Sequence, residues 1–230
     1  MSASSWIPTW SALLWTAAYT WVLAVHLRHS VGMAGRRRLW HATHVLMALG
    51  MIDMFWPGGA MVVGPALPEV VYLAAACGVL VLVVGDARRH RRSTVVWPLT
   101  AVDLLAMAYM FAIPQHGDAV LSTVLAAWFA IEAIAWAAGP LAHAAERAGV
   151  GWPEPEAGAA LPARPVVAVG AAGPALVART EPAVSQGHHE RLDSRVVRAT
   201  LSLMSLGMGY MILAMQFGMA SMSMHGMSGM

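Results

Sequence analysis

Methionine supplies the side chains of this sequence whose type and spacing point most directly to chemistry. The chain has 17 methionines in 230 residues, and six of them recur at steps of three or four along its last apolar segment. They are Met204, Met208, Met211, Met215, Met219 and Met222. On a helix with about 100° per residue, these side chains fall within an arc of roughly 80°. Because thioether sulfur is a soft ligand that selects copper(I), the stripe predicts a line of copper(I) sites.

Comparable faces are expected on two earlier apolar segments, and further ligands in the tail of the chain. The candidate metal ligands of the two segments are His44, Met47, Met51 and Met54 on the first and Met107 and Met110 on the second. Those of the Gly- and Ser-rich tail are Met222, Met224, His225 and Met227. Imidazole also suits copper, so we expect the tail to capture copper(I) and the helix faces to line the interior beyond it.

Helix packing is the alternative explanation of the same methionines. Methionine is an adaptable core filler, so a methionine face on a membrane helix can be a packing seam. Ser205, Gly207 and Gly209 accompany the methionines of the last segment. Small residues at such spacing let helices approach closely. The sequence alone leaves both explanations open.

Three acidic residues, Asp53, Asp103 and Glu132, fall inside apolar segments. A carboxylate within a bilayer is costly unless it is paired, protonated or in contact with water, and no arginine is expected at their depth. Asp103 and Glu132 could carry protons or act as hard ligands, or they could be protonated carboxyls hydrogen-bonded between helices. Asp53 lies near the end of its segment, where we expect it to reach water.

Histidines gather near the ends of the first two apolar segments. His41 and His44 could supply imidazole to a metal, and His26 and His29 are expected at a similar depth on the preceding segment. Two facing histidines at one level could hold a haem. We rank haem below copper, because no second histidine is predicted to lie well inside the bilayer on another helix.

The composition places all of these residues in a membrane protein. The chain is 58% hydrophobic and 11% charged, whereas a soluble domain has about 25% charged residues. A helix of about 20 apolar residues crosses the hydrocarbon core, and six segments approach that length. They cover residues 7–26, 42–57, 67–85, 95–113, 119–139 and 196–219. We therefore predict an all-α integral membrane bundle of about six transmembrane helices.

Arginine sets the predicted orientation of the bundle. All 14 basic residues are arginines, and they lie within residues 26–41, 86–94 and 141–198. Because cytoplasmic loops are enriched in arginine, we predict a multi-pass protein of the plasma membrane with both termini outside the cytoplasm. Its predicted parts are helices one to five within residues 1–140, a flexible cytoplasmic loop at 141–195, helix six at 196–220 and an extracytoplasmic Met/His tail at 221–230.

Two sequence runs resemble the signatures of a known family. They are WHATHVLMALGM at residues 40–51 and MSLGMGYMILAM at residues 204–215. Both are similar to those of an actinobacterial family of multi-pass membrane proteins described as domain of unknown function 5134. The resemblance covers the chain apart from residues 141–195, and it implies a small helical inner-membrane protein but no activity and no site residues. The Met204/Met208 spacing is also similar to that of eukaryotic high-affinity copper transporters, which have three helices, so that likeness concerns ligand chemistry and not fold.

Copper(I) binding through Met and His ligands, for copper storage, inward transfer or delivery to a respiratory enzyme, is the function that these patterns predict. The alternative is a non-metal structural or assembly subunit whose methionine faces pack against a membrane partner or a second copy. An intramembrane enzyme that uses Asp103 or Glu132 is a weaker third hypothesis, because no nucleophile accompanies them. The chain has no phosphate-binding loop, catalytic triad or zinc motif. Its arginine clusters suit topology and anionic lipid headgroups, and nothing in the sequence favours nucleic acid.

Overall fold

The regular structure of the protein is entirely helical. The computed structural model describes residues 7–57, 64, 66–88, 95–147 and 183–227, although the side chains of 114–116, 183–193 and 219–227 are left undescribed. The helices are α1 (Thr9–Gly32), α2 (Gly35–Phe55), α3 (Ala66–Arg88), α4 (Val96–His116), α5 (Ala119–Ala138), α6 (Pro140–Arg147) and α7 (Ala183–Met227). No strand occurs among these residues, which confirms the all-α prediction.

Four of the described helices are long and apolar enough to cross a membrane. They are α3, the part of α4 at Val96–Ile113, α5 and the part of α7 at Ser194–Gly218. The sequence predicts six crossings, and the two others correspond to α1 and α2, which have 24 and 21 residues. Both are less apolar, because α1 is rich in Thr, Trp and His and α2 begins with three consecutive arginines. The four apolar helices indicate a multi-pass membrane protein.

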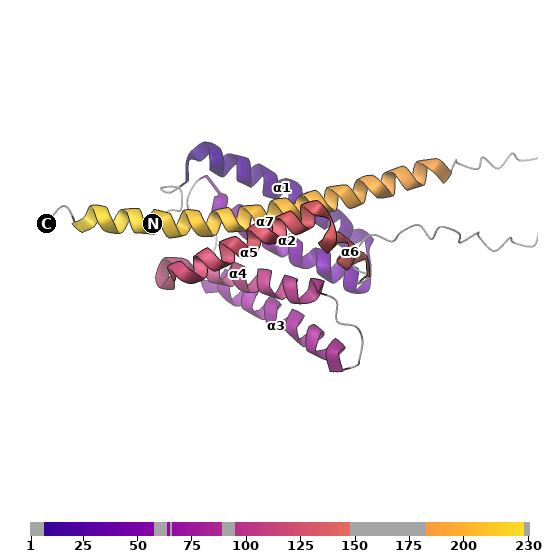
Figure 1. Ribbon diagram of the computed structural model, residues 1–230, viewed down its shortest axis with the longest axis horizontal. Helices are drawn as coiled ribbons and strands as arrows, with labels where there is room; N and C mark the ends of the chain where they lie inside the picture. The colour runs from indigo at the N-terminus through magenta and orange to yellow at the C-terminus, as the bar shows by residue number, and fades with distance from the viewer. Residues whose placement is uncertain (1–6, 58–63, 65, 89–94, 148–182, 228–230) are drawn as a thin grey trace, which may run out of the picture.

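Three helix pairs make up the bundle: α1 with α2, α3 with α4, and α5 with α7. Helix α7 also contacts α1 and α4, and α4 contacts α2, so these helices enclose the interior. Helix α3 lies at the edge, and only Tyr72, Ala76, Val79 and Asp86 of its side chains are buried. Figure 1 shows α7 running along the whole bundle and extending beyond the other helices at both ends.

Helix α5 illustrates how local sequence sets the limits of an element. Asp118 precedes it, and its side chain accepts a hydrogen bond of 2.7 Å from the backbone N–H of Leu121, which satisfies a free donor at the helix start. Gly139 follows its last residue with a φ of 101°, a left-handed conformation that glycine adopts without a Cβ clash. The chain therefore turns sharply there and continues as the short helix α6.

Helix α7 is longer than the sequence predicts. It begins at Ala183, inside the segment 141–195 that is expected to be a flexible loop, and α6 also falls within that segment. It continues to Met227, so the backbone of the expected Met/His tail is helical up to that residue. Extending an existing helix is far easier than starting one, which is why Gly- and Ser-rich residues can prolong it. The side chains of Met219, Met222, Met224, His225 and Met227 lie outside the described residues.

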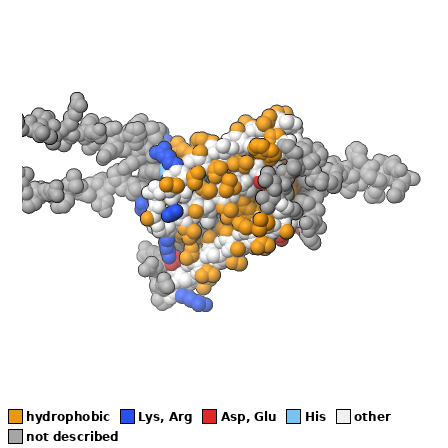
Figure 2. All heavy atoms as spheres, turned by 180° about the vertical axis from the view of Figure 1, so that it is seen from behind, with side chains coloured by type: hydrophobic (Ala, Val, Ile, Leu, Met, Phe, Trp, Pro, Cys, Tyr) orange, Lys and Arg blue, Asp and Glu red, His pale blue; other side chains and the backbone are white. Residues whose placement is uncertain are grey.

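Arginine side chains gather at one end of the bundle. Figure 2 shows them beside a broad apolar band on the visible face. Successive helices run in opposite directions, so the end of one lies near the start of the next. Arg28 lies near the end of α1, Arg36 near the start of α2, and Arg88 is the last residue of α3. Arg36 binds Asp86 of α3 through two hydrogen bonds of 2.6 Å, so α2 and α3 are fastened together at this end. We refer to it below as the arginine end.

Candidate functional site

The described methionines of the three predicted faces all point into the bundle. They are Met47, Met51 and Met54 of α2, Met107 and Met110 of α4, and Met204, Met208, Met211 and Met215 of α7. Each side chain is at most 4% exposed, and all nine belong to one contiguous apolar core. The helical spacing in the sequence therefore corresponds to an inward-facing surface on each helix.

Methionine is segregated from the other apolar residue types. Leu14, Val81 and Ile131 are each at least 60% exposed on the outer surface. Among the described methionines only Met33 is not buried. Lipid solvates apolar side chains as well as a protein interior does, so hydrophobicity does not decide which of them turns inward. The interior position of methionine must come from its shape, its flexibility or its sulfur.

The methionine faces of α2 and α4 meet where the helices approach most closely. Gly50 of α2 leaves space for Met107, whose Cε would lie 2.7 Å from a Cβ built on that glycine. On the other side of α2, the rings of Trp15, Phe55 and Tyr210 stack at centroid distances of 5.6 to 6.3 Å. The interior is thus part sulfur and part aromatic.

Four buried histidines form a cluster that joins α1 to α2 near the arginine end; we call His26, His29, His41 and His44 the histidine cluster. The rings of His26 and His44 stack with a centroid distance of 4.9 Å and an interplanar angle of 13°. The ring of His41 lies 5.1 Å from that of His26 and 5.2 Å from that of His29. All four side chains are less than 9% exposed.

The sequence predicts His26 and His29 at a depth similar to that of His41 and His44, and the structure brings the two pairs into contact. His26 of α1 is fully buried against His41 and His44 of α2. The signal was present in the spacing. Pairs three residues apart, His26/His29 and His41/His44, flank a short connection, so antiparallel helices bring them face to face. Histidines 26, 29 and 41 are the site residues that sequence reasoning left out of the ligand set.

Hydrogen bonds fix the tautomers of the cluster. His44 Nδ1 lies 2.7 Å from the carbonyl oxygen of Trp40, which can only accept, so Nδ1 carries the proton and Nε2 keeps its lone pair. Thr200 Oγ1 donates to the carbonyl of Val197 and therefore accepts from His26 Nε2 at 3.2 Å. Neutral His26 then has a lone pair on Nδ1, which accepts from His41 Nδ1 at 3.0 Å. As a result, His41 also keeps a lone pair on Nε2.

Two neutral imidazoles with a lone pair on Nε2 are the form that metal-binding histidines take. Within the described part of the chain, no three His, Cys, Asp or Glu side chains are arranged to hold a metal ion. A metal held by the lone pairs of His41 and His44 would have two nitrogen ligands, with or without added sulfur. Copper(I) accepts such soft, low-coordinate ligand sets more readily than other biological metals do.

Asp103 of α4 and Glu132 of α5 lie together in the interior, 7% and 5% exposed. Their carboxyl groups are within hydrogen-bonding distance, and the Ser205 hydroxyl of α7 is close to Glu132. Trp136 Nε1 donates to Glu132 Oε1 at 3.2 Å, whereas Asp103 Oδ1 and Glu132 Oε2 have no partner among the described residues. Two adjacent carboxyl groups in an apolar interior can hydrogen-bond to each other when one of them carries a proton.

Asp53, the third acidic residue predicted within an apolar segment, is set apart from that pair. Its side chain is half-buried near the end of α2, consistent with its expected position close to water. The sequence prediction that acidic side chains hydrogen-bond between helices therefore applies to Asp103 and Glu132.

The architecture defines a class: an all-helical membrane protein whose interior is lined by methionine, histidine and a carboxyl pair. Residues 36–215 match the family described as domain of unknown function (DUF5134), so the chain belongs to that family. This confirms the resemblance seen in the sequence, and the match contains both signature runs. No curated protein and no solved structure matches the chain.

Proposed function

We propose that the protein is a copper(I)-binding protein of the plasma membrane, with six transmembrane helices and both termini outside the cytoplasm. Its role is to store copper(I), pass it inward or deliver it to a respiratory enzyme. The observation that carries the proposal is the burial of all nine described methionines of the three predicted faces. Thioether sulfur selects copper(I) over zinc and over the hard divalent ions.

The order of the candidate ligands along α2 and α7 supports a path for copper(I) through the bundle. Helix α2 begins at the arginine end with His41 and His44 and continues with Met47, Met51 and Met54. On α7, Thr200 contacts the histidine cluster through His26, and the methionines from 204 to 215 follow it in the same direction. Sulfur ligands thus lead from the outer half of the bundle toward nitrogen ligands near the arginine end.

The matching orientation rests on the arginines. α1 and α2 complete six crossings if they span with the four more apolar helices, and an even number of crossings puts both termini on one side. The arginine end would then face the cytoplasm. The Met/His residues 221–230, the first seven of which end α7, would lie on the outer side, where they could meet copper first.

Copper(I) affinity is the test of this proposal. The purified protein would be titrated with copper(I) against a competing chelator, as wild type and with Met208, Met211 and Met215 replaced by leucine. Leucine keeps the volume and apolar character of methionine and removes only the sulfur, so the fold should be preserved. We expect the triple variant to bind at least ten-fold more weakly, and X-ray absorption at the copper edge to show sulfur neighbours in the wild type.

Met33→Leu is the matched control, because Met33 lies outside the three faces and is not buried. It should bind copper(I) like the wild type. A deletion of residues 221–230 separates capture by the tail from binding in the core. If the wild type, the triple variant and the deletion all bind equally weakly, the copper proposal is wrong.

The alternative, a non-metal structural or assembly subunit, predicts a different pattern. Leucine at the methionines of α7 would then leave function intact, whereas Ser205→Leu or Gly209→Leu would abolish it. A Cβ on Gly209 would lie 3.4 Å from Ala126 and Phe129, so this small-residue seam is occupied by α5 of the same chain. The buried methionines are likewise covered by the chain's own helices, and a partner surface would have to lie elsewhere.

A further inference from the structure

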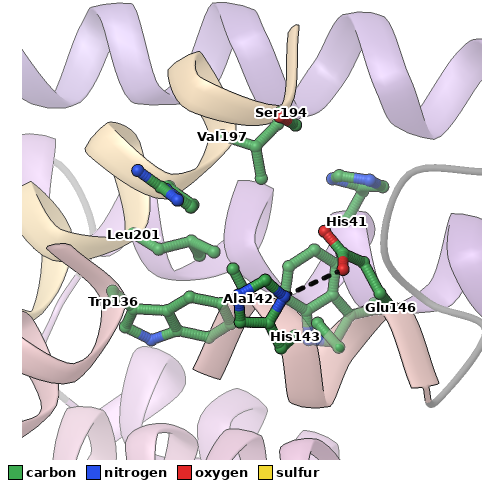
Figure 3. Close-up of a pocket in the computed structure, with 11 residues that line it drawn as sticks. His41, Trp136, Ala142, His143, Glu146, Ser194, Val197 and Leu201 are labelled. Carbon is green, nitrogen blue, oxygen red and sulfur yellow. Dashed lines mark hydrogen bonds and ion pairs between the residues drawn. The ribbon is translucent and has the colours of Figure 1, made fainter. Parts of the chain in front are cut away.

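A pocket at the arginine end lies between α2, α5, α6 and α7, beside the histidine cluster. Its volume is about 60 Å³. Figure 3 shows Val197 and Leu201 of α7 on one side and Trp136, Ala142 and His143 of α5 and α6 on the other. The pocket is therefore apolar on much of its wall. It has room for a few waters or one small oxyanion.

Two donors in the wall of this pocket have no acceptor. Trp40 is 2% exposed, yet its indole Nε1–H has no hydrogen-bond partner among the described residues. The buried Nε–H of Arg198, which also lines the pocket, is without a partner in the same way. Leaving a buried donor unpaired costs about 1 to 3 kcal/mol, and folded proteins rarely tolerate it. Two such donors in one pocket indicate a ligand that accepts hydrogen bonds.

The charges around the pocket favour an anion as that ligand. Arg198 forms no ion pair with any described residue, and its guanidinium lies beside Gly139, where α5 ends. The acidic residue that lines the pocket, Glu146, has its Oε2 3.3 Å from Nδ1 of His143 on the same short helix. Among the described residues, Arg198 therefore has no ion-pair partner, whereas Glu146 has a neighbouring imidazole.

We propose that this pocket binds a phosphate group, carried either by an anionic phospholipid or by free phosphate. A guanidinium and an indole N–H are donors that match phosphate oxygens. Basic pockets between helices at the cytoplasmic side of membrane proteins hold anionic headgroups, and the pocket lies at the arginine end. Val197 and Leu201 would face the apolar part of such a lipid. No methionine lines the pocket, so the inference does not depend on the sulfur ligands of the copper proposal, although His41 of the histidine cluster also lines it.

Native mass spectrometry of the purified protein in a maltoside detergent, which contains no phosphate, tests the proposal in two arms. One arm adds phosphatidylglycerol and the other adds inorganic phosphate. Trp40→Phe removes the indole N–H and keeps an aromatic ring, and Arg198→Gln removes the charge. We expect each variant to bind at least ten-fold more weakly in whichever arm the wild type binds, and Glu146→Gln to bind more tightly.

Arg195→Gln is the matched control, because Arg195 is exposed on the same helix and does not line the pocket. It removes the same charge and should bind like the wild type. Circular dichroism and gel filtration establish that each variant is folded. Binding in the lipid arm alone identifies a headgroup, and binding in both arms identifies a general phosphate site. Absence of binding in both arms, or equal binding by folded Trp40→Phe and Arg198→Gln, would overturn the proposal and leave a pocket that holds only water.

Discussion

The contact between α2 and α4 at Gly50 offers a quantitative prediction about the core. Replacing Gly50 with alanine puts a methyl group onto the Tyr72 hydroxyl and 2.7 Å from Met107 Cε. The methionine end can move aside, but Tyr72 is held by a 2.7 Å hydrogen bond to the Leu46 carbonyl and by stacking on Phe111 at 5.7 Å. The ring must therefore shift, or α2 must separate from both α3, which carries Tyr72, and α4.

The expected loss of stability has two parts, the cost of overpacking and the loss of one hydrogen bond. Overpacking a filled core costs about 1 to 3 kcal/mol, and the net loss of one hydrogen bond costs about 0.5 to 1.5 kcal/mol. Gly50→Ala should therefore lower the free energy of unfolding by about 1.5 to 4.5 kcal/mol. That is roughly 12- to 2,000-fold in the unfolding equilibrium. Unfolding in mixed micelles with increasing denaturing detergent measures this difference.

Gly78→Ala is the matched control, because Gly78 lies in α3 with nothing within 4 Å of an added Cβ. There alanine should be neutral or stabilise the helix by about 0.5 to 1 kcal/mol. Tyr72→Phe removes the hydroxyl that the new methyl group meets, so the double variant Gly50→Ala/Tyr72→Phe should be more stable than the sum of the single effects predicts. If Gly50→Ala is as stable as Gly78→Ala, the reasoning about this close approach is refuted.

Three further predictions concern the arginine end, the carboxyl pair and the topology. Arg36→Lys replaces two hydrogen bonds to Asp86 with a single one at a partly exposed site. It should lower the free energy of unfolding by about 1 kcal/mol in the same assay. No loss would show that this ion pair does not stabilise the fold. Glu132→Gln keeps the shape of a protonated carboxyl, so its free energy of unfolding should stay within about 1 kcal/mol of the wild type. Glu132→Lys should lower the free energy of unfolding by roughly 2.5 to 3.5 kcal/mol or more. A Gln variant as unstable as the Lys variant would mean that the carboxyl is ionised. Reaction of Glu132 with dicyclohexylcarbodiimide, which modifies protonated carboxyls, gives a second measurement. With the native cysteine replaced by serine, a cysteine at Gly117 should react with an impermeant maleimide from outside the cell and one at Arg195 should not, and the reverse pattern would invert the proposed topology.

Hydropathy located the helices well because a helix that crosses the bilayer must be apolar over most of its length. Each of the six predicted segments overlaps one of α1 to α5 or α7, and the steps of three and four correctly placed the nine described methionines of the three faces inside. The ends differ, since hydropathy follows the hydrocarbon core while a helix continues through polar residues. Helix α2 thus includes Arg36, and α7 begins at Ala183, well before the apolar part.

What the sequence could not predict are the contacts that need a partner helix. It singled out Asp103 and Glu132 individually, but they are 29 residues apart on α4 and α5, and only the packing of the bundle brings them together. Their acidic character within apolar segments marked them as candidates, but it did not predict the contact between them. Trp40 and Arg198, far apart in the chain, share a pocket because α6 turns under the end of α5 after Gly139.

By itself, the amino-acid sequence determined that this is a helical membrane protein with an arginine-rich end and with methionine on one face of three helices. These properties depend on local periodicity and on the cost of placing charge in lipid, and both can be evaluated from the order of residues in the chain. The tertiary structure decided which of those faces meet, that four histidines cluster between α1 and α2, and that two residues whose buried donors have no partner among the described residues line one pocket. Such features depend on distances between helices, and in lipid these are set by close packing and hydrogen bonds rather than by hydrophobicity.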